Sequence, residues 1–192
     1  MDEKLYRFLK YTAIAMVVAW IAWSIADTFL IDRIPGNTAF QEGEIFFEDG
    51  GYRRALEKYE EALAAKPDAP HYVRAKARTL MQLERYDESL RWFNQAVDLQ
   101  PYFGGTYANR GILFDRMGKY EQAVADYERA VDLDEEVAEG PHWLIRFLRN
   151  QPEPPPTVAD RLAYLKQELA KSEDQRVLRV PELDEKQRTY KK

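Results

Sequence analysis

Apolar residues follow three patterns along the chain. An uncharged apolar run extends from Tyr11 to Ala26 and continues past Asp27 to Ile31. Between residues 36 and 136, apolar residues recur at helical spacing in segments separated by short polar or glycine-containing turns. After residue 157, one narrow apolar stripe recurs at intervals of four, three and four. These patterns predict an all-α chain: one long apolar helix, an array of short amphipathic helices, and a C-terminal helix.

The N-terminal run has the length and composition of a membrane-spanning helix. About 21 residues at about 1.5 Å per residue span the hydrocarbon core of roughly 30 Å. Tyr11 stands at the start of the run and Trp20 and Trp23 toward its end, where interfacial aromatic residues are expected. We therefore expect a short leader over 1–10, a transmembrane helix over 11–31, a linker over 32–35, and contact with the lipid bilayer.

A cleaved secretory signal is the alternative interpretation of the same run. Ser24, Ile25 and Ala26 fit a small-x-small cleavage site before Asp27, whereas acids in the leader disfavour a signal. The positive flanks predict the topology, since Lys4, Arg7 and Lys10 precede the run and only Arg33 follows it closely. We expect the N-terminus in the cytoplasm and the rest of the chain on the opposite side, which is the periplasm in a bacterium.

The middle of the chain repeats itself with a period of 34 residues. Positions of one kind recur at this shift: Tyr52, Tyr86 and Tyr120; Ala55, Ser89 and Ala123; Tyr59, Phe93 and Tyr127; Ala62, Ala96 and Ala130; and Pro67 with Pro101. Small residues allow two helices to cross closely, aromatic residues fill the space between hairpins, and proline stops the second helix. The period predicts three helical hairpins over 36–69, 70–103 and 104–136.

This order of small, aromatic, alanine and proline positions resembles the tetratricopeptide repeat. The resemblance implies a right-handed solenoid in which the first helix of each hairpin lines a concave groove. We expect a capping helix over 137–150, followed by a stiff proline-rich spacer over 151–156.

The resemblance also implies which residues line the groove and bind a peptide or helix of a partner. Carried over position by position, they are Phe40, Glu44, Phe47, Arg74, Arg78, Met81, Asn109, Ile112 and Arg116, with Arg146 and Arg149 from the capping helix. Two interpretations of the arginines stay open. They bind acidic and apolar residues of a partner, or they pair with neighbouring acids of the chain.

One subclass of the family clamps the C-terminal carboxylate of cytosolic chaperones with Lys, Asn and Arg at five groove positions. Phe40, Glu44, Ala75, Gly105 and Asn109 occupy those positions here, so one of five matches. The sequence therefore argues against a receptor for chaperone tails.

The C-terminal part is expected to hold one amphipathic helix and a charged tail. Thr157 is a suitable N-cap for a helix over 157–171, and residues 172–192 carry little apolar pattern. The stripe on the helix either folds back on the repeats or docks on a partner. Its residues are Val158, Leu162, Leu165 and Leu169.

Composition narrows the chemistry. The net charge is −5 and the repeat region is acidic, which disfavours nucleic-acid binding. The chain has no cysteine, and its two histidines, His71 and His142, lack partners at metal-ligand spacing. Phosphate loops and nucleophile motifs are also missing from the sequence. We expect no enzyme activity, no cofactor, no metal and no small-molecule substrate.

Taken together, the sequence predicts a membrane-anchored scaffold for protein–protein interaction. The leading hypothesis is an assembly factor or adaptor for a membrane protein complex. Its partners are then other proteins, integral membrane subunits among them. The alternative is a permanent accessory subunit of a respiratory, photosynthetic, transport or envelope complex.

Overall fold

The computed structural model describes residues 3–31, 34–134, 137, 156–180 and 189 of the 192-residue chain. Every regular element within these residues is helical, which confirms the predicted all-α fold. The predicted capping helix over 137–150 and the spacer over 151–156 lie almost wholly outside the described residues. The groove candidates Arg146 and Arg149 and the histidine at 142 lie outside them as well.

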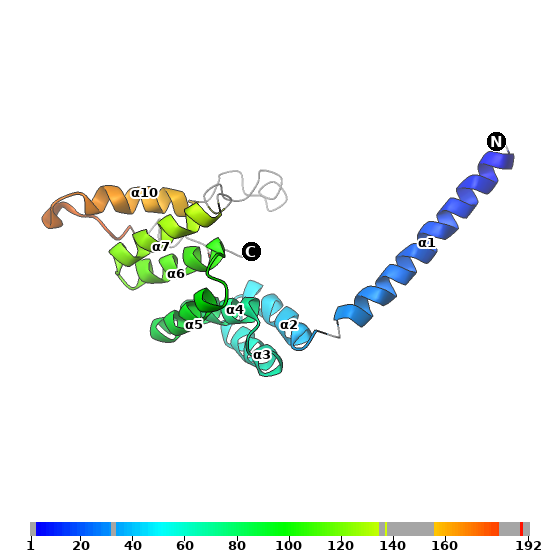
Figure 1. Ribbon diagram of the computed structural model, residues 1–192, viewed down its shortest axis with the longest axis horizontal. Helices are drawn as coiled ribbons and strands as arrows, with labels where there is room; N and C mark the ends of the chain where they lie inside the picture. The colour runs from blue at the N-terminus through cyan, green and yellow to red at the C-terminus, as the bar shows by residue number, and fades with distance from the viewer. Residues whose placement is uncertain (1–2, 32–33, 135–136, 138–155, 181–188, 190–192) are drawn as a thin grey trace.

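Three antiparallel helical hairpins stack side by side (Figure 1). They pair α2 (Asn37–Glu48) with α3 (Tyr52–Ala65), α4 (Pro70–Gln82) with α5 (Tyr86–Leu99), and α6 (Gly104–Arg116) with α7 (Tyr120–Leu133). The second helices begin at Tyr52, Tyr86 and Tyr120, so the 34-residue period of the sequence is the period of the solenoid. Predicted turns and proline stops fall at the observed helix ends.

Each hairpin turn passes through a left-handed backbone conformation at the same repeat position. Gly50 and Gly118 have φ of 75° and 73°, and Glu84 has φ of 60°. Glycine adopts this conformation without a Cβ clash, whereas a glutamate there is strained. The turn geometry is therefore kept even in the repeat that lacks the glycine.

Small residues on the inner helices give room to large aromatic rings. Tyr59 and Tyr127 are fully buried, and each ring lies where a Cβ on Gly43 or Gly111 would stand, with the nearest ring carbon at 2.6 Å. Phe93 takes the same place in the second hairpin and is also fully buried. This close fit fixes the crossing of the two helices in each hairpin.

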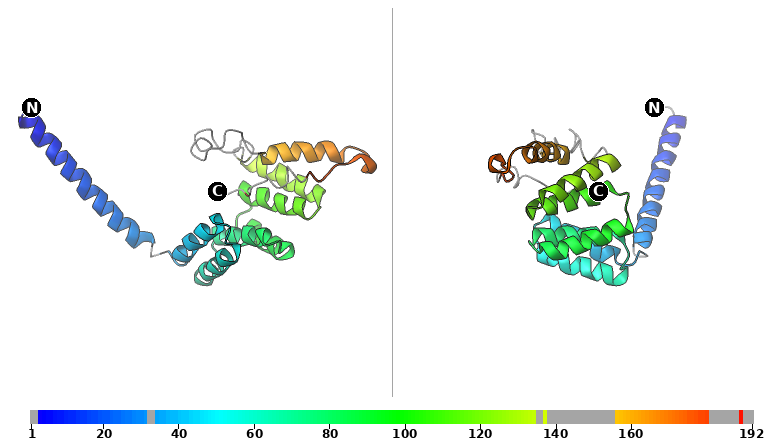
Figure 2. Two further views of the ribbon diagram at one scale, coloured as in Figure 1. Left: turned by 180° about the vertical axis from the view of Figure 1, so that it is seen from behind. Right: turned by 60° about the vertical axis from the view of Figure 1, so that its left-hand side comes forward.

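The long apolar helix α1 (Glu3–Ile31) stands away from the repeats (Figures 1 and 2). Its segment Glu3–Asp27 is long and apolar enough to cross a membrane. The rest of the protein buries no part of its most apolar stretch. Tyr11, Trp20 and Trp23 are 67%, 71% and 74% exposed. The helix begins within the predicted leader, because residues 3–10 contain mostly good helix formers.

The C-terminal helix α10 (Val158–Leu169) lies against α7, as both views show (Figures 1 and 2). Its start is the predicted one: the Thr157 hydroxyl accepts from the Asp160 amide, and the Asp160 carboxylate accepts from the Thr157 amide. A short 3₁₀ turn, η1 (Glu173–Gln175), then reverses the chain; Arg176 has an extended backbone, and residues 177–180 belong to no helix or strand. Helix α10 lies on α7 as α4 lies on α3 and α6 on α5, so it continues the stack.

Candidate partner-binding surface

The nine described groove candidates all lie on the inner helices α2, α4 and α6. Burial divides them into two groups. The buried ones are Phe47, Arg78, Met81, Asn109 and Ile112, and the ones that keep some exposure are Phe40, Glu44, Arg74 and Arg116. Buried members can shape the surface, but only the exposed group can touch a partner without rearrangement of the repeats.

Glu44 and Arg78 neutralise each other between the first two inner helices. Arg78 Nη2 donates to Glu44 Oε1 at 2.8 Å, and the Tyr59 hydroxyl donates to the same oxygen at 2.6 Å. Burial and the bond to Glu44 raise the pKa of Tyr59 far above its usual value. These hydrogen bonds connect the first two repeats. Arg78 therefore pairs with a neighbouring acid of the chain, which is one of the two interpretations given for the groove arginines.

Arg74 has a different environment. Its guanidinium lies 4.1 Å from the centre of the Phe103 ring and donates from Nη1 to the side-chain carbonyl of Gln100. Burial and the nearby charge of Arg78 lower the pKa of Arg74 to about 10. Its contacts within the described chain are thus with neutral groups and a like charge. A carboxylate from outside would relieve this imbalance.

Arg116 lies at the far end of the same face. It donates from Nη1 to Gln82 Oε1 at 3.4 Å, which is again a neutral partner. Arg74 stands in the first half of its helix and Arg116 at the last position of the next inner helix. When both arginines are placed on one common repeat, their positions are eight residues apart, which corresponds to about 12 Å along a helix axis. The two arginines therefore mark two ends of a path across α4 and α6.

An aromatic cluster flanks Arg74 on the side of the first repeat. The Phe40 ring centre lies 5.0 Å from that of Tyr72 and 5.2 Å from that of His71, and the His71 and Tyr72 centres are 4.2 Å apart. Partial desolvation by its neighbours, followed by the charges of Arg74 and Lys66, lowers the pKa of His71, so this ring is mostly neutral at pH 7. His71 is exposed and Phe40 half-buried, which provides an apolar, planar surface beside a cation.

Sequence reasoning missed Tyr72, which holds this cluster in place. Its ring is fully buried, and its hydroxyl donates to the Pro35 carbonyl at 3.1 Å, in the segment that leads from α1 into the repeats. The resemblance gave no signal for this bond, because Tyr72 is not among the implied groove positions. The contact ties the candidate surface to the chain directly after α1.

The inner helices differ in exposure from one end of the stack to the other. Helix α2 has three buried residues, whereas α6 has ten, including Gly105, Ala108 and Ile112. Part of this burial comes from the C-terminal segment, since Leu178, Val158 and Leu165 pack in one cluster with α6. The accessible part of the face is therefore the first two repeats and the Arg116 end.

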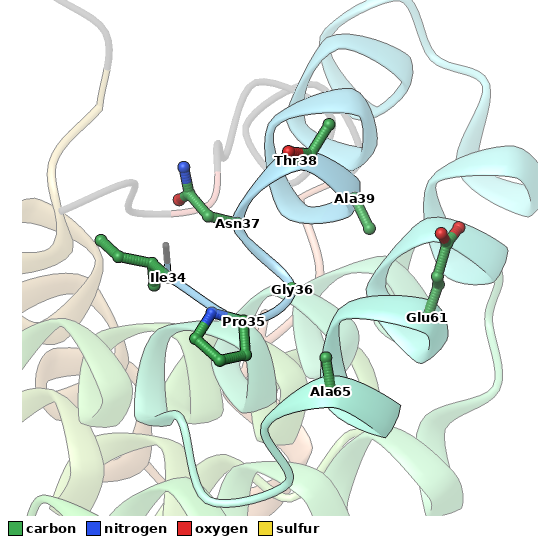
Figure 3. Close-up of a pocket in the computed structure, with 8 residues that line it drawn as sticks. All are labelled: Ile34, Pro35, Gly36, Asn37, Thr38, Ala39, Glu61 and Ala65. Atoms are coloured by element: carbon green, nitrogen blue, oxygen red, sulfur yellow. The ribbon is translucent and has the colours of Figure 1, made fainter. Parts of the chain in front are cut away.

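A shallow hollow lies at the beginning of the first repeat (Figure 3). It has a volume of about 240 Å³ and is lined by Ile34, Pro35, Gly36, Asn37, Thr38, Ala39, Glu61 and Ala65. Small-molecule sites usually enclose about 300–1,000 Å³. Gly36 has φ of 81° here, and a Cβ on it would stand 2.5 Å from the Ala62 carbonyl oxygen. The hollow marks close packing of α2 on the end of α3.

Within the described ranges, no three side chains of His, Asp or Glu come together in a way that could hold a metal ion. The surface therefore offers two guanidinium cations, Arg74 and Arg116, a group of rings and hydrogen-bonding amides. Such a set recognises polypeptide by charge, stacking and hydrogen bonds.

The stripe on α10 is placed against the repeats. Val158 and Leu165 are buried, and Leu162 and Leu169 are half-buried. The buried Arg161 on the same helix donates from Nε and Nη2 to both carboxylate oxygens of Asp115 in α6, at 2.7 and 2.8 Å. Sequence reasoning missed this pair, since the partners are 46 residues apart and neither belongs to the repeat pattern.

Two family models of the tetratricopeptide repeat match the chain, at residues 40–102 and 106–137. Among curated proteins, the small glutamine-rich tetratricopeptide repeat-containing protein 2 of Mycosarcoma maydis is 29% identical over 93 residues, which cover 48% of this chain and 26% of that protein. A DnaJ homolog subfamily C member 7 homolog of Dictyostelium discoideum is 31% identical over 103 residues, covering 52% and 19%. The chain thus spans about a quarter or less of these relatives.

Solved structures show the same fold. The first TPR of Spaghetti (RPAP3) bound to the HSP90 peptide SRMEEVD superposes with a TM-score of 0.58 at 22% identity, covering 73% of this chain and 98% of that one. The second TPR of the same protein, bound to the same peptide, gives 0.51 at 25% identity, covering 54% and 95%. These likenesses cover the repeats.

Proposed function

We propose that this chain, whose residues 40–137 contain tetratricopeptide repeats, is a membrane-anchored module that binds a segment of another protein on its inner face. One observation carries the proposal: the partly buried Arg74 contacts only neutral groups and a like charge within the described chain, beside the exposed ring of His71 and the half-buried ring of Phe40. The site performs recognition without catalysis.

The charges favour a partner segment with acidic and apolar residues. A carboxylate at Arg74 forms a charge-assisted hydrogen bond, and a second one at Arg116 sets the direction of the segment across α4 and α6. An apolar or aromatic side chain between them stacks on Phe40 and His71. This recognition differs from that of the chaperone subclass.

Three clamp positions of that subclass are unsuited to a terminal carboxylate here. Glu44 is acidic and already holds Arg78, and Ala75 and Gly105 are buried and bring no polar side chain. The peptide named with the Spaghetti structures is acidic. It therefore shares a charge preference with the proposed partner, while the side chains that receive it differ.

Helix α1 anchors the module by crossing a bilayer once. The apolar side chains of its segment Glu3–Asp27 are exposed on all sides, which water penalises and hydrocarbon favours. The bond from Tyr72 to Pro35 keeps the binding surface close to the end of the anchor. A partner recognised there is therefore itself at the membrane, and we place the repeats on the side opposite the N-terminus, the periplasm in a bacterium.

Assembly factor and permanent accessory subunit remain two forms of this function. The assembly factor or adaptor is the form that we favour, and one capture experiment separates the two. The full-length tagged protein is purified from its native membrane in mild detergent, and the captured proteins are identified and counted. A changing, substoichiometric set supports an assembly factor, whereas a fixed set at constant ratio supports a subunit.

The same capture tests the surface when repeated with Arg74→Glu and Arg116→Glu. A matched control is Arg91→Glu, which reverses an exposed charge on the outer helix α5. We expect both groove variants to lose captured proteins at least tenfold and the control to keep them. Equal capture by all three variants would refute the proposed surface.

A further inference from the structure

The extended segment after α10 is held by side chains of that helix through its backbone. Tyr164 donates its hydroxyl to the Val177 carbonyl at 2.7 Å, and a Glu168 carboxylate oxygen accepts from the Val177 amide at 2.8 Å. Arg161 Nη2 donates to the Leu178 carbonyl at 3.1 Å. These three side chains stand at helical spacings of three and four, on one face of α10.

Neighbouring side chains hold the groups of this face in place. Asp115 fixes the Arg161 guanidinium through two hydrogen bonds, and the same guanidinium lies 5.4 Å from the centre of the Tyr164 ring. Lys171 Nζ donates to the other carboxylate oxygen of Glu168 at 2.6 Å. Because each group is held by a neighbour, the face loses little side-chain freedom when it receives an extended chain.

Side-chain recognition is limited to one leucine and its flanking arginines. Leu178 packs against the core cluster of the third repeat, whereas Val177 is 55% exposed. Arg176 donates to the Leu169 and Lys171 carbonyls at the end of α10, both at 3.0 Å. Arg179 donates to the Arg116 carbonyl at the end of α6 at 3.4 Å. Both arginines thus meet the negative ends of helices.

We infer that the face of α10 formed by Arg161, Tyr164 and Glu168 is a second peptide-binding site, specific for an extended Arg-x-Leu-Arg segment. In the structure the chain's own Arg176–Arg179 fills it. The partner is a protein that presents an extended segment of this basic and apolar chemistry and replaces the internal one. This site differs in charge preference from the Arg74 surface, which selects acidic residues, and does not depend on it.

The exposure of the internal segment supports its replacement by another chain. Among its side chains, Val177 and Arg179 are exposed and only Leu178 contributes to a hydrophobic cluster. Its backbone bonds are made to side chains rather than within a helix or sheet. An external segment can form the same contacts, so exchange needs no unfolding of the repeats.

The test uses a fluorescent peptide with the sequence of residues 173–180 and the full-length protein in mild detergent. Leu178→Asp frees the site by removing the leucine contact, and a chain that ends at Lys171 frees it by removing the segment. We expect both variants to bind the peptide at least tenfold more tightly than the unaltered protein. Adding Glu168→Ala should weaken that binding at least tenfold, while Gln167→Ala, on an exposed position of α10, should leave it unchanged.

Two outcomes would overturn the inference. One is the absence of peptide binding to both freed variants when circular dichroism shows their helices intact. The other is equal binding of a peptide in which the leucine is replaced by aspartate. If the shortened chain fails to fold, the Leu178→Asp variant alone decides between these results.

Discussion

Removing the positive charge of Arg161 should detach α10 from the repeats. The Arg161–Asp115 pair is deeply buried, with side chains 8% and 5% exposed, and Asp115 also accepts a hydrogen bond from the Tyr127 hydroxyl at 3.3 Å. Breaking a buried pair by removing one partner costs about 3–5 kcal/mol, because the other charge stays buried without compensation. We therefore expect Arg161→Met to weaken the docking of α10 by this amount.

The free energy lost with the ion pair can be compared with the free energy that the apolar contacts of α10 contribute. Val158 and Leu165 are 9% and 0% exposed, and full burial of each such side chain contributes about 1.5–3 kcal/mol. A loss of about 3–5 kcal/mol is comparable with their sum, so α10 should open locally while the three hairpins stay folded.

Hydrogen exchange followed by mass spectrometry measures this opening. Protection of the α10 amides should fall by about a hundredfold or more, since about 1.4 kcal/mol corresponds to tenfold. Lys166→Met is the matched control: it breaks the ion pair of α10 with Glu128 of α7, but that pair is half exposed and contributes about 0–1 kcal/mol. Adding Asp115→Asn to Arg161→Met should restore part of the protection. Equal losses in Arg161→Met and Lys166→Met would refute the reasoning.

Three further predictions concern the repeats and the anchor. Gly43→Ala should lower the free energy of unfolding by about 1–3 kcal/mol, because the new Cβ would stand 2.6 Å from the buried Tyr59 ring. Chemical denaturation measures this change, and an unchanged midpoint would contradict the described packing. The pKa of His71 is lowered in the fold, so the unfolded state binds more protons and stability should fall as pH drops below about 6.5; His71→Gln should remove this part of the pH dependence. The full chain should stay in the membrane pellet after alkaline extraction, and a chain without residues 1–31 should be soluble; release of both would contradict a spanning α1.

The repeats could be predicted from the sequence because their packing is periodic. The same tyrosine start, small crossing residue and aromatic filler recur at a fixed offset, so each hairpin supports the assignment of the others. Glu84 shows that the pattern is stronger than local preference: it adopts the turn conformation that glycine supplies in the other two hairpins. The helical hairpins and the places of their turns therefore followed from the period.

The binding surface could be predicted only as a set of positions. A repeat position says that Arg74 and Arg78 face inward, but the bond of Arg78 to Glu44 and the neutral surroundings of Arg74 depend on single side chains in neighbouring hairpins. Asn109 and Ile112 are buried here, since the C-terminal segment packs against the third repeat. Contacts of this kind join residues that are far apart in the sequence, and they depend on the side chains of this particular protein.

The central claim is that a protein partner lies on the inner face beside Arg74. The most direct measurement replaces His71 by a photocrosslinking phenylalanine analogue in the full-length protein in its native membrane, with the same replacement at Gln95 on the outer helix α5 as control. After irradiation, the account predicts a discrete crosslinked protein at position 71 that disappears when Arg74→Glu is added, and none at position 95. Crosslinks that are the same at both positions, or that persist with Arg74→Glu, would contradict it.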